Sequence, residues 1–423
     1  MRLAGALVGA VLLAPAAGAI EQTPPTYAGE IAPILERRCV GCHRAGGGAP
    51  MALDSYERVR PWGAAIERAV ASGAMPPWHA DPAHGRFAND RSLPPQERES
   101  LLLWLRSGLP AGDLRQVHVS AESPPAQDCQ LPHALCRPPI ASVDSERAGE
   151  PPWRIGTPDA ILELPEVTVP AEGEVPYHSY MVPSPFDRDV WIEAAETRPG
   201  NPAVVHHVIV EVAAPRAAAA GDDPRTVGSL GGYVPGDEPL VMPPGLARLL
   251  PAGAQVFFQI HYTPNGEAAT DRTRLALRLA KGPPRHEART GVVSNPFLWI
   301  PAGAPEVRAE ASWLFPRDAM LLSMRPHLHL RGRSFEFRAR YPDGTEEILL
   351  RVPRWSFGWQ TTYVLAEPKP MPVGTELLCI ATWDNSGAGP DNPDPAADVS
   401  WGERTSDEMM IGFFDYYFVS PAG

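Results

Sequence analysis

The feature that most constrains the fold is a pattern of short apolar segments that begins near residue 151. Segments rich in valine and isoleucine, such as 204–212 and 256–262, alternate with turns that contain proline or glycine. The 423 residues include 51 prolines and 37 glycines, which interrupt helices but suit short strands joined by turns. We therefore expect two all-β sandwich domains, at residues 151–282 and 283–423.

Residues 20–113 have a different, helical pattern. Apolar side chains recur at helical spacing in 27–38, 56–71 and 92–105. The sequence therefore predicts a small all-α domain before the β region. Residues 114–150 are rich in proline, serine and glutamine and have little periodicity, so we interpret them as a linker.

Residues 1–19 have the features of a secretory signal peptide. Arg2 precedes an apolar core, and Ala17-Gly18-Ala19 forms a cleavage site of the A-x-A type. An uncleaved membrane anchor is the alternative, but the apolar core is short for a bilayer span. We therefore expect a bacterial protein that is periplasmic or secreted, without stable membrane insertion. In such a compartment Cys129 and Cys136 are expected to form a local disulfide, with a metal pair as the alternative.

The charge balance argues against a nucleic-acid partner. Acidic residues outnumber basic ones, 50 to 37, and the formal net charge is −13. Proteins that bind nucleic acid need a basic face for the phosphates. We therefore expect no nucleic acid among the partners.

The sequence CVGCH at residues 39–43 is a C-x-x-C-H motif. In such motifs two cysteines tether a haem through thioether bonds, and the adjacent histidine, here His43, is an axial ligand of the iron. A redox dithiol and half of a zinc site are the alternatives. The sequence has no second C-x-x-C and no thioredoxin-like βαβ pattern around this one. We therefore expect one covalent haem c, bound to Cys39 and Cys42.

A second axial ligand is expected from the same helical domain. Met75 lies in the sequence AMPPW, where prolines stiffen the loop, and a thioether ligand would raise the reduction potential. Met51, His79 and His84 are rival ligands, and a core position is the alternative for Met75. With these features, residues 27–113 resemble the small class I c-type cytochromes.

Five of the 12 histidines form three groups on predicted strands: His206 with His207, His261 alone, and His327 with His329. The alternating pair points both rings to one face of a strand, whereas joint ligation by the adjacent pair needs a bulge or a sheet edge. Imidazole suits zinc, copper, iron and nickel, and no acidic residue completes a helical H-E-x-x-H. We therefore expect these histidines to bind metal.

These histidines, with the Q-x-H of residues 259–261 and the sequence SDEM at 406–409, resemble the copper type II, ascorbate-dependent monooxygenases. This is the family of the peptidylglycine and dopamine hydroxylating enzymes, and the resemblance covers roughly 151–423. It implies two jelly-roll-like β domains that bind one copper each. The implied ligands are His206, His207 and His261 for an electron-transfer copper, and His327, His329 and Met409 for the catalytic copper.

The resemblance also implies roles near the substrate. Gln259 matches a glutamine beside the electron-transfer copper. Arg325 matches an arginine that holds the substrate carboxylate in the peptidylglycine enzymes, with a structural salt bridge as the alternative. The other family partners of that carboxylate fall here on Ile411 and Phe413, which departs from the pattern for amidation of glycine-extended peptides. We therefore expect a mainly apolar substrate site with one cationic anchor.

Another departure concerns the cysteine that follows the family's methionine ligand, because this chain has Met410 there. Cys379 thereby loses its expected disulfide partner, and we expect it to be buried and free. The alternative for Met409 is a position in the strand core. Since neighbours on a strand alternate, we expect Met410 to take that position instead.

Together these features predict an exported monooxygenase that uses two coppers and O2 to hydroxylate a C–H bond of a small organic substrate. Electrons would come from ascorbate, or from a periplasmic donor through the attached haem. A non-catalytic periplasmic electron-transfer or copper-binding protein is the alternative. A zinc hydrolase is a weaker one, because a thioether is a poor zinc ligand.

Overall fold

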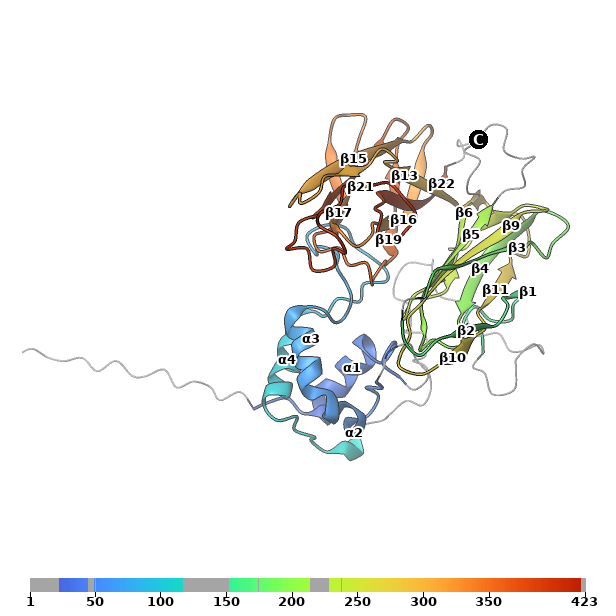
Figure 1. Ribbon diagram of the computed structural model, residues 1–423. Helices are drawn as coiled ribbons and strands as arrows, with labels where there is room; N and C mark the ends of the chain where they lie inside the picture. The colour runs from blue at the N-terminus through green and yellow to red at the C-terminus, as the bar shows by residue number, and fades with distance from the viewer. Residues whose placement is uncertain are drawn as a thin grey trace, which may run out of the picture.

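The computed structural model describes residues 23–44, 49, 51–116, 152–173, 175–213, 228–236 and 238–419. In this part of the chain a small helical unit precedes a larger region of strands, as the sequence predicted (Figure 1). The predicted signal peptide, and Cys129 and Cys136 of the predicted linker, lie outside the described residues. No described helix combines the length and the apolar composition that a membrane span requires.

The helical unit is built around one apolar core. Its segments are η1 (Tyr27–Ile31), α1 (Ala32–Arg38), α2 (Tyr56–Val59), η2 (Arg60–Trp62), α3 (Gly63–Ser72), α4 (Pro95–Arg106) and η3 (Leu114–Gln116). Ile31, Leu35 and Trp104 are completely or almost completely buried in that core. These segments follow the three helical patterns of the sequence.

The first group of strands forms two facing sheets. Its strands are β1 (Ala160–Glu163), β2 (Val167–Val169), β3 (His178–Pro183), β4 (Val190–Arg198), β5 (Val205–Ala213), β6 (Gly228–Tyr233), β7 (Leu240–Val241), β8 (Leu246–Leu250), β9 (Gln255–Tyr262), β10 (Ala269–Asp271), β11 (Arg274–Leu279) and β12 (His286–Glu287). One large sheet has the order β1-β11-β4-β8-β12, with β7 paired to β4, and the other has the order β3-β9-β5-β6, while β2 and β10 pair in a separate two-stranded sheet. β12 follows the predicted divide at residue 282, yet it pairs with β8.

The second group of strands forms two further sheets. Its strands are β13 (Arg289–Ser294), β14 (Trp299–Ile300), β15 (Val307–Leu314), β16 (Ala319–His327), β17 (Gly332–Arg340), β18 (Glu346–Val352), β19 (Tyr363–Met371), β20 (Glu376–Trp383), β21 (Val399–Ser400) and β22 (Ile411–Phe418). The two large sheets have the orders β13-β22-β16-β19 and β15-β20-β17-β18, while β14 and β21 pair in a separate two-stranded sheet. Phe337, Cys379 and Phe414 lie in the core between them.

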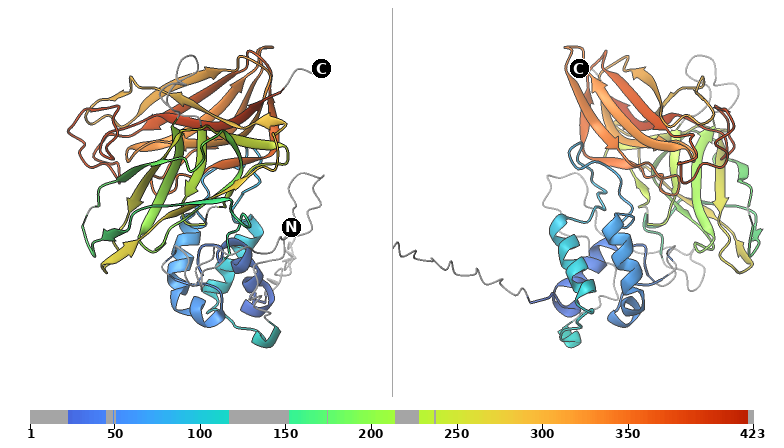
Figure 2. Two further views of the ribbon diagram at one scale, coloured as in Figure 1. Left: turned by 90° about the vertical axis from the view of Figure 1, so that its right-hand side faces the viewer. Right: turned by 60° about the vertical axis from the view of Figure 1, so that its left-hand side comes forward.

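Side chains alternate between the two faces of β5 and β9, and this alternation determines which of them point away from the core of the first group of strands. Val210 and Phe258 are fully buried between the two sheets of the first group. His207 and His261 stand three residues away on the same strands, so they project from the opposite face of the sheet. Figure 2 shows the two groups of strands side by side, and on this face the His261 ring lies 6.5 Å from the Phe357 ring of the second group.

A buried polar network joins the two groups of strands. Arg248 of β8 is 3% exposed, and its Nη2 lies 2.8 Å from Oδ2 of Asp415 on β22. Thr290 accepts a hydrogen bond from Arg248 and donates one to Asp415, each at 2.7 Å. Ser323 donates a further hydrogen bond to Asp415 at 2.8 Å. The Asp415 carboxylate is therefore bound by one cation and two hydroxyl groups at this contact.

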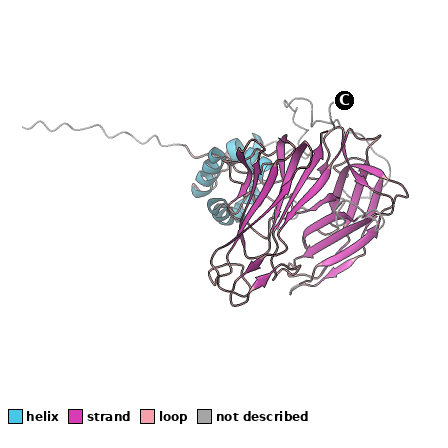
Figure 3. Cartoon of the chain, turned by 90° about the horizontal axis from the view of Figure 1, so that it is seen from above, coloured by secondary structure: helices cyan, strands magenta, loops and turns pink. Residues whose placement is uncertain are grey.

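The segment between α3 and α4 joins the helical unit to the second group of strands. Ala88 donates its amide hydrogen to the carbonyl of Val364, and Ala366 donates to Arg86, so this segment pairs with β19. The Trp78 ring also packs against Tyr363, at a centroid distance of 4.9 Å. Figure 3 shows the helices gathered on one side of the strands.

Candidate metal centres

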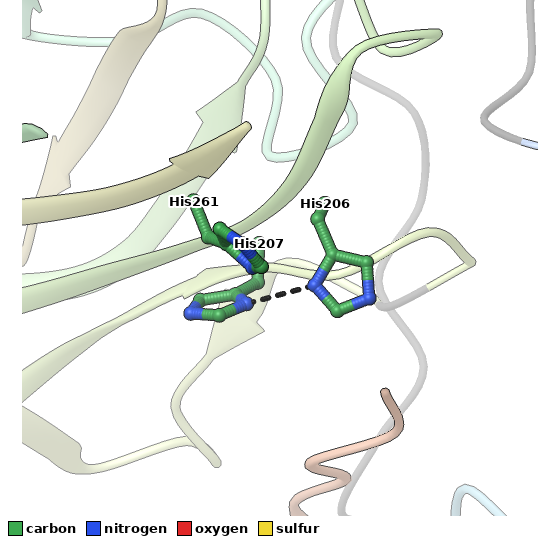
Figure 4. A group of neighbouring side chains, drawn as sticks. All are labelled: His206, His207 and His261. Carbon is green, nitrogen blue, oxygen red and sulfur yellow. Dashed lines mark hydrogen bonds between the residues drawn. The ribbon is translucent and has the colours of Figure 1, made fainter. Parts of the chain in front are cut away.

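The three-histidine group consists of His206, His207 and His261. His207 and His261 are direct partners across β5 and β9, so their side chains are neighbours on one face. The register of this pair shifts between Val205 and His207. This irregularity brings the ring of His206 beside the other two (Figure 4), as joint ligation by adjacent histidines requires.

The nitrogen atoms of this group converge on one point. One ligand atom from each residue lies within 4.8 Å of the others, and the Nδ1 atoms of His206 and His207 are 3.0 Å apart. Three nitrogens on bonds of about 2 Å to one ion lie roughly 3.3–3.5 Å apart. The Nδ1 of His261 is buried without a hydrogen-bond partner. An orphaned nitrogen beside two converging ones fits a metal ligand set.

The protonation of the three-histidine group also suits a metal. Burial lowers the pKa of His206, and burial together with the neighbouring rings lowers the pKa of His207 well below its usual value. Burial and the His206 charge lower the pKa of His261 to about 4. The rings are therefore neutral near pH 7, which is the form that binds a metal ion.

The two-histidine group consists of His327, at the end of β16, and His329, in the loop that follows. Their ring centroids are 5.1 Å apart. The Nδ1 of His327 lies 2.6 Å from Oε1 of Gln360, and the Nδ1 of His329 lies 3.1 Å from the carbonyl oxygen of Asp407. Both rings are therefore held through Nδ1, which leaves each Nε2 for a ligand. Burial and the nearby His329 lower the pKa of His327 to about 3.

Met409 and Met410 have the opposite environments that strand alternation predicts. Met410 is fully buried in the core of the second group of strands, whereas Met409 is half-buried and outside that core. The preceding Glu408 accepts backbone hydrogen bonds from His329 at 2.9 Å and Arg331 at 2.6 Å. Met409 is thereby attached to the loop that carries the two-histidine group. The expectation for Cys379 is confirmed, since it is fully buried and not disulfide-bonded.

The C-x-x-C-H motif lies just after α1. The Nδ1 of His43 is 3.2 Å from the carbonyl oxygen of Met51, so its Nε2 is left for an axial bond. Cys39 packs against the helical core, and burial raises the pKa of its thiol to about 12. Cys42 lies instead against Gly236, in the turn after β6. This donor set fits a covalently attached haem with one histidine ligand.

The candidates for the second axial ligand have different environments. Met51 packs against the helical core, whereas Met75 is half-buried and outside it. This removes the core position as an explanation for Met75. His79 and His84 belong to the segment that runs along β18 and β19, and burial, helped by Arg354, lowers the pKa of His79.

The expected substrate residues share one face of the second group of strands. Arg325 and Phe413 are direct partners across β16 and β22, and the guanidinium carbon lies 4.4 Å from the centre of the Phe413 ring. The same ring is 6.5 Å from His327. Burial raises the pKa of Glu211 on β5, and the charge of Arg325 partly offsets that rise. Glu211 is therefore an acidic neighbour of the expected anchor that sequence reasoning missed.

Three further side chains near the histidines, those of Tyr177, Phe357 and Gln360, were not predicted from the sequence. The Tyr177 ring is 4.9 Å from His261 and its hydroxyl group bonds to Thr405. Phe357 and Gln360 lie in the loop between β18 and β19, which no motif marks. Gln259, expected beside the three-histidine group, stands two residues before His261 on the same face of β9.

Comparisons with known proteins assign no family to this chain. No protein-family model matches the sequence, and no curated protein matches it either. A solved structure from Eubacterium rectale, described as a secreted protein, is 10% identical over 57% of this chain and 69% of its own, with a TM-score of 0.19. PBCV-1 VP54 is 10% identical over 64% and 96%, with a TM-score of 0.21. Allantoicase is 10% identical over 47% and 74%, with a TM-score of 0.16. Scores this low establish no common fold.

Proposed function

We propose that this protein is an exported copper- and haem-dependent monooxygenase that hydroxylates a C–H bond of a small organic substrate with O2. The observation that carries the proposal is the convergence of the three imidazoles of β5 and β9, next to a second imidazole pair at the end of β16. Phe357 lies within 6.5 Å of a ring from each group. Two metal sites this close suit a reaction that needs two electrons.

The donor sets favour copper at both positions. Three imidazoles would hold one ion, while His327, His329 and Met409 would hold the other. A thioether among imidazoles favours cuprous copper and is a poor ligand for zinc. When bound, copper supplies one-electron redox chemistry and activates O2. Burial keeps the imidazole rings neutral, so each ring would offer one unprotonated nitrogen to an ion.

The helical unit would hold a c-type haem through Cys39, Cys42 and His43, with Met75 as the second axial ligand. A haem of this type stores one electron. The pairing of residues 86–88 with β19 holds the unit directly against the copper-binding region. We therefore expect a fixed electron donor, reduced by ascorbate or by a periplasmic donor protein.

The substrate site is proposed on the face that carries Arg325, Phe413 and Ile411. The phenyl and butyl groups would bind an apolar body, and the guanidinium would bind an anionic group of the substrate. Glu211 lies within electrostatic reach of that guanidinium. A negative charge on Glu211 would weaken the binding of anions at this face.

Metal analysis and oxygen uptake test this proposal. We expect one haem and two coppers per chain, and oxygen uptake that needs a reductant and substrate and stops when a copper chelator is added. His207→Ala should remove one copper and His327→Ala the other, each with loss of uptake. Copper that is reduced without oxygen uptake, across a panel of acids, amines and neutral compounds, would instead indicate an electron-transfer or copper-binding protein.

A further inference from the structure

The loop that joins β18 to β19, residues 353–362, contacts both histidine groups. The Phe357 ring lies 6.5 Å from His261 and 6.2 Å from His329, measured between ring centroids. Trp355 donates its indole hydrogen to the carbonyl oxygen of His329 at 3.3 Å. One short loop therefore contacts the first group of strands and the second.

Gln360, near the end of this loop, makes two hydrogen bonds that fix the orientation of its amide group. Its Nε2 donates to the carbonyl oxygen of Phe357 at 3.3 Å, and only the NH2 end of the amide can do so. The opposite end, Oε1, must then face Nδ1 of His327, at 2.6 Å. An amide oxygen only accepts hydrogen bonds, so Nδ1 of His327 carries the proton.

This arrangement determines which nitrogen of His327 is free for a ligand. A neutral imidazole has one protonated nitrogen and one with a lone pair. With the proton held on Nδ1 by Gln360, the lone pair is on Nε2. The backbone carbonyl of Asp407 holds His329 in the same way, through Nδ1. Both rings of the two-histidine group are therefore prepared for binding through Nε2.

We propose that Gln360 is a positioning residue that selects the Nδ1–H tautomer of His327 and orients its ring for metal binding. The Phe357 carbonyl holds the amide in place, so the loop acts on His327 through Gln360. This inference rests on the proposed function only in taking His327 as a metal ligand. Partners of this kind typically change metal affinity 10–100-fold when they are removed.

The first test uses the metal-free protein, so it does not depend on copper. Nitrogen-15 NMR of labelled histidine should show His327 as the Nδ1–H tautomer in the native chain and as a mixture in Gln360→Leu. Gln360→Glu keeps an acceptor at this position and should restore the Nδ1–H form. The same tautomer in Gln360→Leu as in the native chain would overturn the proposal.

The second test measures copper. Competition with a cuprous chelator should show roughly 10–100-fold weaker binding at the two-histidine group in Gln360→Leu, with the three-histidine group unchanged. Gln96→Leu, an exposed position on α4, is the matched control and should bind like the native chain. Thermal unfolding shows that each variant is folded. Unchanged copper affinity in folded Gln360→Leu would refute the proposal, whereas a native chain that binds no copper at all would refute the proposed function.

Discussion

Two neighbouring methionines, Met409 and Met410, allow metal binding and packing to be separated by single substitutions. Met410→Ala should destabilise the protein by about 2–5 kcal/mol, because it leaves a cavity in a fully buried core position. Met409→Ala should leave the stability nearly unchanged and weaken copper at the two-histidine group. Urea unfolding and copper content per chain measure the two effects. If Met410→Ala instead lost copper and Met409→Ala lost stability, Met410 would be the thioether ligand.

Arg325 and Glu211 should have opposite effects on the binding of substrates. Arg325→Gln removes a charged hydrogen bond of about 1.5–3 kcal/mol, so KM for anionic substrates should rise roughly tenfold to a hundredfold. Glu211→Gln removes the neighbouring negative charge and should lower KM for the same substrates. Neutral substrates serve as the control, with KM unchanged in both variants. Equal effects on anionic and neutral substrates would assign Arg325 a structural role only.

At the scale of the elements, the contact of β8 with β22 should make stability depend on pH. Burial tends to raise the pKa of Asp415, but Arg248 and the hydroxyl groups of Thr290 and Ser323 outweigh it and lower the pKa below its usual value. The folded state therefore binds fewer protons than the unfolded chain in acid. The resulting stability is fully present above the unfolded pKa, about 3.9, and is lost as the pH falls through the lower folded value.

Substitution of this carboxylate tests the prediction. Asp415→Asn leaves Arg248 buried without its counter-ion, so the free energy of unfolding should fall by about 3 kcal/mol at pH 7. The difference from the native chain should shrink as the pH falls below the folded pKa of Asp415. Urea unfolding across that pH range measures it. A difference that does not change with pH would show that the ion pair adds no stability.

Short strands were predictable because their apolar pattern is local. The runs at 204–212 and 256–262 became β5 and β9 with bounds shifted by about one residue. For the adjacent histidines the sequence required a bulge or a sheet edge, and the structure has a register shift between Val205 and His207. Gln360 could not be predicted, because it is 33 residues from His327 and meets it only through the tertiary fold. For the same reason the sequence placed residues 86–88 in the helical domain without their partner β19.

At the scale of the whole molecule, the helical unit meets the first group of strands where Cys42 lies against Gly236. Gly236 has a φ of 85°, and a Cβ atom there would overlap the Sγ of Cys42. Gly236→Ala should therefore push the C-x-x-C-H motif away from the turn after β6. Because electron transfer slows steeply with distance, oxidation of the reduced haem by copper should slow several-fold, with haem content unchanged.

A matched glycine separates this effect from backbone strain. Gly266 has a φ of 97°, and a Cβ atom added there would have no neighbour within 4 Å, so Gly266→Ala carries a similar strain without the overlap. Stopped-flow absorbance of the haem compares the two variants with the native chain. Equal rates in Gly236→Ala and Gly266→Ala would show that the Cys42 contact has no part in electron delivery.

The pairing of residues 86–88 with β19 has a consequence for the solubility of the β region. β19 is the last strand of its sheet, and near its start the backbone groups of Val364 and Ala366 bond to residues 86–88. Without that unit the strand would present unpaired amide and carbonyl groups, which invite pairing with another chain. A fragment that starts at residue 152 should therefore self-associate, and light scattering should report a larger mass than one chain. Glu367 and Lys369 of β19 place two opposite charges at this border, and Lys369 bonds to Glu347 nearby. If the fragment self-associates, the helical unit keeps the edge of β19 from pairing with other chains, and the two parts of the chain should be expressed together.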